Sequence, residues 1–388
     1  MRINKSGIFI RLRLSKGWGC VLWENDFPIQ ILSVKDNGSY FIPENKLARK
    51  RYGYINKVWV LDNNKNTEVD ECQFDIDMVY TWVDDSDPEW LEKKEACLRL
   101  LSNDNSHHVT SFSSSRFKNR DELLFSLRSV EYYAPFIRKI FIVTDGQIPK
   151  WLDIKNKKII IVDHTDIFDD LTHLPTFNSH AIEMHLHRIM GLSDHYIYMN
   201  DDFFLRRRVN PSDFFELPNG NTKVFFSSQR IPVENIGLDL LPVDTAAING
   251  QKLLETHFYV KVTNKLKHMP YPQNKPLIKE ICSKFNEFTK TSSTKFRSKS
   301  DYSLPASFYH HYALLAGKAQ KDELPYLYAD IGSRHFLSIL NYIRFSGKYK
   351  SFCINDTGDS SYLPSDKIDK LLDILFNKIY PYKAEFEK

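Results

Sequence analysis

Apolar and polar residues alternate over much of the first 70 residues. The segment IFIRLRLS (8–15) follows this alternation, and GCVLW (19–23) and KVWVLD (57–62) are further short apolar runs. A period of two residues is typical of strands that bury one face. We therefore predict a small β-rich N-terminal module over residues 1–70, and no pattern in it indicates chemistry.

From residue 71 onward, short apolar runs alternate with segments of helical periodicity. The runs that predict buried strands are IDMVYTWV (76–83), KIFIVTDG (139–146), KIIIVDH (158–164) and HYIYM (195–199). Helical spacing predicts helices over RDELLFSLRSVEYYA (120–134) and NSHAIEMHLHRIM (178–190). Strands that alternate with helices indicate an α/β fold, with a mostly parallel sheet and covering helices.

The second half of the chain is richer in helical periodicity. Two further helices are predicted over 274–288 and 303–317, and KSFCIND (350–356) predicts a late strand. The polar stretch 289–301 is predicted to be a mobile loop. We expect a catalytic domain over residues 71–360 with a helical insertion at about 245–345, followed by a C-terminal amphipathic helix within 361–388.

Polar side chains end several of the predicted strands. These are Asp84, Asp145, Asp163, Asn200, Asp201, Asp202 and Asp356. Ligands bind outside the carboxyl ends of the strands in parallel sheets, so these residues predict a shared rim. Carboxylate oxygens are the ligands that Mg²⁺ and Mn²⁺ prefer, although adjacent aspartates more often cap turns or pair with arginine. Unpaired carboxylates are costly beside the apolar residues that flank Asp201 and Asp202. The metal interpretation gains weight because Asp84 and Asp356 end two other predicted strands.

Basic side chains near these acids are candidates to receive phosphate charge. Arg116, Arg120 and Arg128 flank the first predicted helix, and Arg297 lies in the polar stretch, although each is also an ordinary surface charge if judged alone. His268 precedes two prolines in KHMPYP and is the preferred catalytic histidine. His185 and His187 do not share a helix face, which argues against a zinc site between them.

Composition narrows the class of protein. Among 388 residues, 53 Lys and Arg face 49 Asp and Glu, a net charge of +4 that does not indicate nucleic-acid binding. Five cysteines without a CxxC pair fit a reducing cytoplasm, and no signal peptide or spanning apolar run is predicted. The GxGxxG, GxxxxGK[ST] and GxSxG motifs are absent from the sequence, so dinucleotide, P-loop and hydrolase-elbow chemistry lack support.

Taken together, the motifs resemble the Stealth family of sugar-1-phosphate transferases over about residues 75–360. The similar blocks are DIDMVYTWVDDSDPEW (75–90), a long second block from RFKNRDELL (116–124) through LPTFNSHAIEMHLHRI (174–189) to YMNDDFFL (198–205), KHMPYPQNKPLIKEI (267–281) with KFRSKSDYSLPASFYHHYAL (295–314), and FCINDTGD (352–359). Asp85 departs from the family pattern, where glycine is expected.

The resemblance implies a glycosyltransferase-A-like fold that uses a UDP-sugar, most commonly UDP-N-acetylglucosamine. The acceptor hydroxyl would attack the sugar-linked phosphorus, UMP would leave, and a phosphodiester would form in a capsular glycan. An ordinary glycosyltransferase that releases UDP and a non-catalytic carbohydrate-binding protein are the alternatives. A cytoplasmic location is expected, and the resemblance leaves room for peripheral association with a membrane-bound capsule assembly complex.

The resemblance also implies roles for individual residues. Catalytic roles would fall to His268, Arg297, Asp202 and Arg116, and the Mg²⁺ or Mn²⁺ ligands would be Asp201, Asp202 and Asp356. The residues expected to bind substrate are Thr81, Trp82, Val83, Asp84, Arg120, Asn178, Ser179, His180, Glu183, Asn200 and Asn249. Whether His268 takes the acceptor proton or steadies the phosphoryl group stays open.

Overall fold

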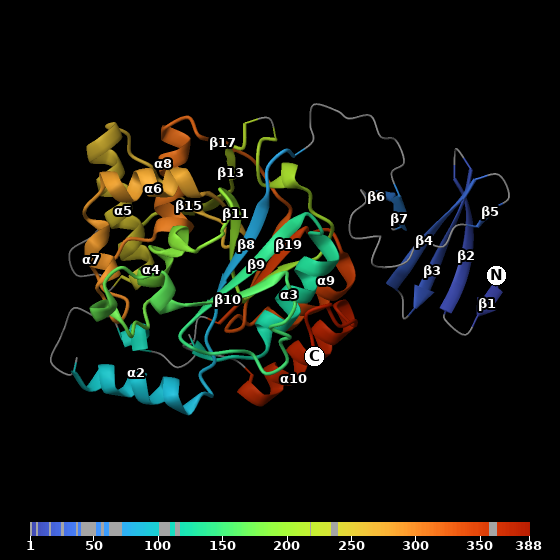
Figure 1. Ribbon diagram of the computed structural model, residues 1–388, viewed down its shortest axis with the longest axis horizontal. Coiled ribbons are helices and arrows are strands. Elements are labelled where there is room, and N and C mark those ends of the chain that lie inside the picture. The colour runs from blue at the N-terminus through green and yellow to red at the C-terminus, as the bar shows by residue number, and fades with distance from the viewer. Residues whose placement is uncertain are drawn as a thin grey trace. The chain divides into compact units, whose positions relative to one another are not determined.

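The chain forms two compact units, Met1–Glu71 and Cys72–Lys388 (Figure 1). The computed structural model describes residues 72–100, 109–112, 117–217, 219–233, 240–356 and 363–388, together with the strands within residues 2–61. Unit one contains β1 (Arg2–Asn4), β2 (Gly7–Leu14), β3 (Gly17–Glu24), β4 (Phe27–Lys35), β5 (Gly38–Ser39), β6 (Tyr52–Ile55) and β7 (Val58–Leu61). Strands β1 to β5 form an antiparallel sheet in chain order, and β6 pairs with β7.

A five-stranded sheet in the order β10-β9-β8-β11-β16 organises the second unit. Its strands are β8 (Ile76–Thr81), β9 (Ile137–Thr144), β10 (Ile159–Asp163), β11 (His195–Asn200) and β16 (Tyr271–Asn274). All pairs are parallel except β11 with β16, so the predicted α/β fold with a mostly parallel sheet is confirmed. In the β8–β11 register Thr81 lies opposite Asn200, which brings two predicted site segments together at the carboxyl edge.

A second sheet in the order β12-β19-β18 lies beside the end of β11. Its strands are β12 (Phe203–Leu205), β18 (Tyr326–Asp330) and β19 (Ser351–Asn355). Two small pairs join β13 (Thr222–Val224) to β17 (Ala319–Lys321) and β14 (Phe226–Arg230) to β15 (Asn264–Leu266). The Asp201–Asp202 turn therefore connects the two larger sheets, because it lies between β11 and β12.

Helices cover both sides of the central strands. They are α2 (Pro88–Leu100), α3 (Glu122–Tyr133), α4 (Ser179–Glu183), α5 (Pro242–Phe258), α6 (Lys275–Lys284), α7 (Phe288–Ser292), α8 (Tyr309–Leu315), α9 (Phe336–Ser346) and α10 (Ser365–Ile379). In Figure 1, α5 to α8 lie on one side of the central strands, and α3, α9 and α10 on the other. None of the described helices is long and apolar enough to cross a membrane.

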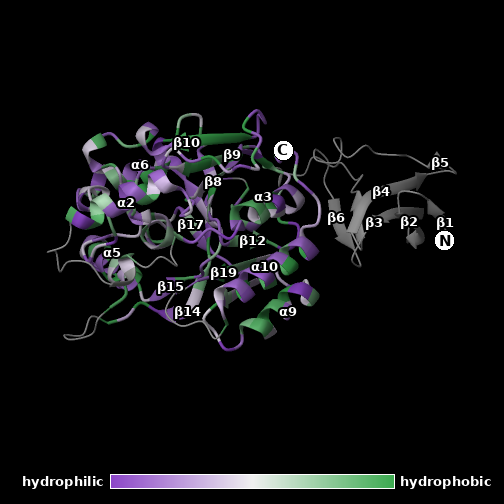
Figure 2. Ribbon diagram, turned by 90° about the horizontal axis from the view of Figure 1, so that it is seen from below, coloured by the Kyte–Doolittle hydropathy of each residue, from purple (hydrophilic) through white to green (hydrophobic). Residues whose placement is uncertain are grey.

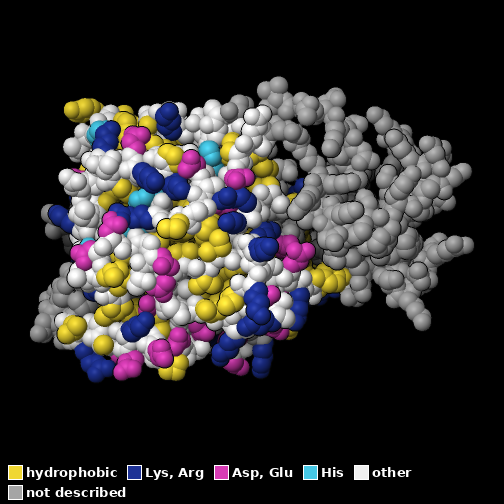
Figure 3. All heavy atoms as spheres, viewed as in Figure 1, with side chains coloured by type: hydrophobic (Ala, Val, Ile, Leu, Met, Phe, Trp, Pro, Cys, Tyr) yellow, Lys and Arg dark blue, Asp and Glu magenta, His cyan; other side chains and the backbone are white. Residues whose placement is uncertain are grey.

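An aromatic core joins α10 to α3 and the second sheet. The ring of Phe376 lies 4.9 Å from that of Phe125 and 4.7 Å from that of Phe204, which stacks on Phe352 at 5.0 Å. Full burial of such a ring contributes about 1.5–3 kcal/mol to folding. Figure 2 shows β9 and β10 as hydrophobic, whereas α6 and α10 carry both characters. On the face in Figure 3, basic and acidic side chains are interspersed.

Several helices differ from the sequence expectations. The helix predicted over 178–190 is short, because α4 ends at Glu183 and a 3₁₀ turn follows at Leu186–Arg188. His185 and His187 are both buried, although one straight helix would not bury both on one face. The segment predicted as one helix over 303–317 begins as a π-helical turn, Leu304–Phe308, before α8.

Two larger expectations also need correction. The region 245–345, expected to be a helical insertion, contributes β16 to the central sheet and therefore belongs to its framework. The stretch 289–301, expected to be a mobile loop, begins with α7 and buries Thr291, Phe296 and Asp301 completely. Hydrogen bonds to the Asp301 carboxylate hold this stretch inside the protein.

Candidate functional site

A cavity of about 750 Å³ lies at the carboxyl ends of β8, β9 and β11. Predicted site residues that line it are Thr81, Trp82, Val83, Arg120, Ser179, Glu183, Asn200, Asp201, Asp202, His268, Arg297 and Asp356. They come from segments far apart in the sequence, and the parallel sheet brings them to one edge, where ligands bind in such folds.

Other predicted residues lie outside the cavity lining. Asp84 accepts hydrogen bonds from the Ser86 backbone N–H at 3.0 Å and from its hydroxyl at 2.7 Å, so it shapes the turn after β8. Asn178, His180 and Asn249 lie behind the cavity wall, where they hold other residues in place. Arg116 lies outside the described residues.

Asp202 lies in the turn that joins β11 to β12. Its backbone carbonyl accepts from the N–H of Ile354 at 3.1 Å, which ties the turn to β19. Its Oδ2 lies 3.2 Å from Sγ of Cys353 and 3.6 Å from Nε2 of His268. Its buried Oδ1 has no hydrogen-bond partner among the described residues. Burying a carboxylate oxygen without a hydrogen-bond partner costs free energy. This oxygen at the cavity wall is therefore a candidate position for a ligand.

The acids around Asp202 are crowded and shielded from solvent. Burial raises the pKa of Asp201 well above its usual range, and the neighbouring charges of Glu122 and Asp202 raise it further. Burial also raises the pKa of Glu122 to about 7, although backbone N–H groups and Arg120 act in the opposite direction. Glu122 therefore changes its protonation near neutral pH at the wall of the cavity.

Arg120 forms ion pairs with two acids. Its Nη2 lies 2.7 Å from Oδ2 of Asp356, and its Nε lies 2.8 Å from Oδ1 of Asp369 in α10. Lys118 also pairs with Asp369, at 3.1 Å. Asp356 thus reaches the cavity with one oxygen already bound to a guanidinium, whereas Asp202 does not contact Arg120 in any hydrogen bond or ion pair of the described residues.

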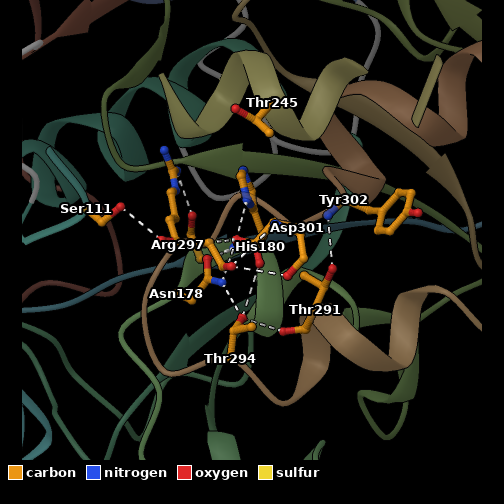
Figure 4. Close-up of polar contacts among 12 residues, drawn as sticks. Ser111, Asn178, His180, Thr245, Thr291, Thr294, Arg297, Asp301 and Tyr302 are labelled. Carbon is orange, nitrogen blue, oxygen red and sulfur yellow. Dashed lines mark hydrogen bonds and ion pairs between the residues drawn. The ribbon is translucent and has the colours of Figure 1, made fainter. Parts of the chain in front are cut away.

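Asn178 and His180 belong to a buried polar cluster, here called the Asp301 network (Figure 4). The carboxylate of Asp301 is completely buried and accepts from Nδ2 of Asn178 at 2.8 Å and from the backbone N–H of Ser298 at 3.0 Å. The Nδ1 atom of His180 lies 3.2 Å away, and the Thr294 hydroxyl donates at 3.3 Å. These donors satisfy the oxygens of the buried carboxylate.

This network positions Arg297. The Arg297 guanidinium donates to the Ser179 hydroxyl at 2.8 Å, while its backbone carbonyl accepts from Ser111 at 2.9 Å. Burial lowers the pKa of Arg297, and the charges of Glu183 and Asp301 oppose that shift. A guanidinium stays protonated at neutral pH despite such a shift, so Arg297 is a buried cation in the cavity lining.

A buried tyrosine contacts two of the cavity residues, Glu183 and Thr81. The Tyr198 hydroxyl donates to Oε1 of Glu183 at 3.0 Å and lies 3.0 Å from the Thr81 hydroxyl. These contacts fix Glu183, which was predicted to bind substrate, as a buried acid near Arg297. Glu183 is therefore not the helix-surface acid that its sequence position alone would allow.

Sequence reasoning did not single out several residues at or beside the cavity. Glu122, in the first turn of α3, lines the cavity, and Cys353 of β19 is buried beside Asp202. Asp330 ends β18, a strand that the sequence analysis did not predict. The available signal was the strand-end rule, which already applied to Asp356 two positions after Ile354 and applies equally to Asp330.

The predicted metal site is only partly assembled. Asp202 lines the cavity, and its Oδ1 has no hydrogen-bond partner among the described residues. Such an oxygen is a suitable ligand for a divalent cation. Asp356 is bound to Arg120, and burial favours the protonated form of Asp201. Among the described residues, the acid, histidine and cysteine side chains that could hold an ion together are Asp202, His268 and Cys353.

Family comparison decides the class of this chain. Stealth conserved region 1 matches residues 74–102, conserved region 2 matches 116–223, and conserved region 3 matches 267–314. The chain belongs to the Stealth family. These regions include β8, the Asp201–Asp202 turn, His268 and Arg297, so part of the cavity lining comes from the conserved regions of the family. The fourth block, which contains Asp356, stays a prediction.

Curated Stealth relatives cover most of this chain. Exopolysaccharide phosphotransferase SCO6023 of Streptomyces coelicolor is 39% identical over 320 residues, which is 82% of this chain and 53% of the relative. Exopolysaccharide phosphotransferase CpsY of Mycobacterium leprae is 36% identical over 344 residues, 87% of this chain and 61% of the relative. The chain thus spans a little over half the length of these relatives.

Solved structures were compared as well. A galactosyltransferase LgtC complex with donor and acceptor sugar analogues aligns with 79% of this chain and 96% of its own, at 11% identity and a TM-score of 0.39. The structure of an active-site mutant of LgtC aligns with 77% of this chain and 95% of its own, at 11% identity and a TM-score of 0.37. These scores are too low to support an inference.

Proposed function

We propose that this Stealth protein transfers a hexose-1-phosphate, N-acetylglucosamine-1-phosphate in the first instance, from a UDP-sugar to a hydroxyl of a glycan acceptor. UMP leaves and a phosphodiester forms, as a step of capsular polysaccharide synthesis. The observation that carries the proposal is the convergence of Asp202, His268 and Arg297 on one cavity. The phosphotransferase names of its relatives support the same reaction class.

The cavity offers opposite charges for the two parts of this chemistry. Phosphoryl transfer depends mainly on positioning and on stabilising charge that spreads over the phosphoryl oxygens. Arg297, held by Ser179 and the Asp301 network, supplies a fixed cation for those oxygens. Thr81, Trp82 and Val83 line the cavity at the end of β8 and are the proposed walls for the uridine.

His268 is the proposed base. Its Nε2 faces Oδ2 of Asp202 at 3.6 Å, and its Nδ1 lies 3.4 Å from the Tyr271 hydroxyl. In the reaction the acceptor oxygen bonds to the sugar-linked phosphorus, and the bond between that phosphorus and the bridging oxygen of UMP breaks. The acceptor proton moves to Nε2 of His268, and the nearby Asp202 carboxylate stabilises the resulting imidazolium.

A divalent cation is proposed as the cofactor, Mg²⁺ or Mn²⁺. Asp202 would hold it through Oδ1, with Asn200 and Asp356 on the same rim of the cavity. When bound, it would neutralise charge on the diphosphate. Further proposals are a cytoplasmic location and peripheral association with a membrane-bound capsule assembly complex, with no nucleic acid as partner.

Product analysis tests the reaction class. The protein is incubated with UDP-N-acetylglucosamine, a short glycan acceptor and Mg²⁺, and the products are followed by ³¹P NMR. We expect a phosphodiester resonance and an equal amount of UMP. Release of UDP with a new glycosidic bond would instead identify a glycosyltransferase, and glycan binding without turnover would identify a binding protein.

A pair of histidine variants assigns the base. His268→Ala should abolish UMP release, whereas the exposed His335→Ala should retain it. Near-normal turnover by His268→Ala, measured under the same conditions, would remove His268 from the mechanism.

A further inference from the structure

Asp202, His268 and Cys353 each present one ligand atom, and these atoms lie within 4.8 Å of one another. Oδ2 of Asp202 lies 3.2 Å from Sγ of Cys353 and 3.6 Å from Nε2 of His268. Tetrahedral zinc, with bonds of about 2.0–2.3 Å, separates its ligand atoms by about 3.3–3.5 Å. Two of the three ligand pairs therefore have nearly the spacing of a zinc site.

We propose that these three residues form a site for a thiophilic divalent cation, with Zn²⁺ as its first occupant. A thiolate, an imidazole and a carboxylate together suit Zn²⁺ and Co²⁺, whereas Mg²⁺ prefers oxygen ligands alone. When the cation binds, the thiol proton of Cys353 is released to solvent, so that metal replaces hydrogen between Sγ and Asp202.

The backbone holds two of the ligands in place. Phe203 of β12 pairs with Cys353 of β19, and the N–H of Ile354 donates to the Asp202 carbonyl at 3.1 Å. Asp202 and Cys353 are therefore adjacent through the ladder of the second sheet. Ligands that are fixed before the metal arrives lose little conformational entropy on binding.

The third ligand is oriented by residues outside the group. The Tyr271 hydroxyl lies 3.4 Å from Nδ1 of His268, and the Tyr326 hydroxyl donates to the His268 carbonyl at 2.6 Å. Metal-bound histidines usually have such a partner on the second ring nitrogen, which fixes the tautomer that ligates. Nε2 is therefore the nitrogen available to the cation.

The cavity gives access to the site. Three protein ligands leave the fourth tetrahedral position unfilled, and Asp202 and His268 both line the cavity. That position is where a water molecule or a phosphate oxygen would bind.

Cobalt spectroscopy tests the site directly. The full-length protein, freed of metal and kept reduced, is titrated with Co²⁺ and followed by absorption. We expect a near-ultraviolet thiolate-to-cobalt charge-transfer band that saturates at one equivalent and disappears when Zn²⁺ is added. A folded protein without this band, or loss of the band to an equal amount of Mg²⁺, would overturn the proposal.

Matched variants locate the sulfur ligand. Cys353→Ser should lose the band, while Cys97→Ser, whose thiol lies in α2 outside the group, should keep it. Circular dichroism checks that each variant is folded. His268→Gln retains every cysteine and should bind Co²⁺ at least about tenfold more weakly. A band unchanged in both Cys353→Ser and His268→Gln would contradict the assignment.

An inhibition assay connects the site to the transfer reaction and rests on the proposed function. Zn²⁺ bound to Nε2 of His268 would block the nitrogen that takes up the proton of the acceptor hydroxyl. Zn²⁺ should therefore suppress UMP release in the presence of excess Mg²⁺. The two proposals fail separately. A missing cobalt band would leave UMP release intact, and a failed transfer assay would leave the band intact.

Discussion

Two carboxylates of the second unit, those of Asp301 and Asp202, have opposite surroundings. Asp301 is completely buried, and donors from Asn178, Ser298 and Thr294 surround its oxygens. Asp202 is partly buried, and one of its oxygens has no partner among the described residues. A carboxylate whose oxygens all accept hydrogen bonds stabilises the fold. A carboxylate oxygen without a hydrogen-bond partner can instead bind a ligand.

The largest expected effect separates these roles at Asp202. Asp202→Asn keeps the shape of the side chain but removes its charge, so we expect UMP release to fall by about 10³-fold, the cost of losing one group that stabilises a transition state. The melting temperature should change little. UMP release and thermal melting measure the two quantities.

A surface aspartate provides the control for this experiment. Asp194→Asn alters a side chain that is 64% exposed, and both activity and melting temperature should match the wild type. If Asp202→Asn unfolded the protein and lost activity only for that reason, the contrast with Asp301 would fail.

The converse substitution is Asp301→Ala. It removes the acceptor for several buried donors, and breaking such a network costs about 3–5 kcal/mol in the free energy of unfolding. Urea denaturation measures the loss, with the exposed Asp366→Ala as control. A wild-type unfolding free energy together with lost activity would place Asp301 in the reaction and not in the framework.

Acid should weaken the fold through the two buried histidines that follow α4. Burial lowers the pKa of His185 and of His187 to about 4, below the 6.5 of an unfolded histidine. The unfolded chain therefore binds more protons between these values, and stability falls as pH decreases from 6.5 toward 4. Each histidine contributes up to about 1.4 kcal/mol per pH unit.

Urea denaturation at pH 7, 6 and 5 checks this pH dependence. His185→Asn removes one of the two titrating groups, so its stability should vary less with pH than that of the wild type. An equally steep pH dependence in the variant would show that other groups cause the acid instability.

The smallest effect is expected at a partly exposed ion pair at the edge of the cavity. Lys118 and Asp369 are paired at 3.1 Å, but their side chains are 31% and 41% exposed. Exposed pairs contribute about 0–1 kcal/mol, so Lys118→Ala should lower the unfolding free energy by less than about 1 kcal/mol. Thermal melting in low and high salt measures this loss of stability. A larger loss would mean that the ion pair stabilises the fold as the Asp301 network does.

The same contrast explains what sequence could predict. Apolar runs determine the strands of the central sheet, because burial on both faces requires continuous hydrophobic residues. Asp202 and His268 were recognisable because an acid after a strand and a histidine before two prolines have no packing role. Their convergence on one cavity was expected only from the strand-end rule and the family resemblance.

The Asp301 network was not predictable in the same way. Residues 289–301 are polar, and polarity alone favours a surface loop. They are buried because Asn178, the N-cap residue of α4, and Asn249 from α5 supply hydrogen bonds across more than fifty positions of the chain. Such compensation depends on tertiary contacts, which a linear pattern does not contain. The pairing of Asp356 with Arg120 was invisible for the same reason.

The anchoring of α3 by residues 376–388 has a consequence for protein synthesis. Arg128 pairs with Glu387 at 2.7 Å and donates to the Tyr380 carbonyl, while Tyr380 donates to the carbonyl of Leu205. Domains fold as their residues leave the ribosome, at about 5–20 residues per second. The core of the second unit is therefore complete only after residues 376–388 have been synthesised. Until then, the nascent chain exposes Phe204 and a helix α3 in which the Arg128 guanidinium lacks its partner, and chaperones can bind this surface.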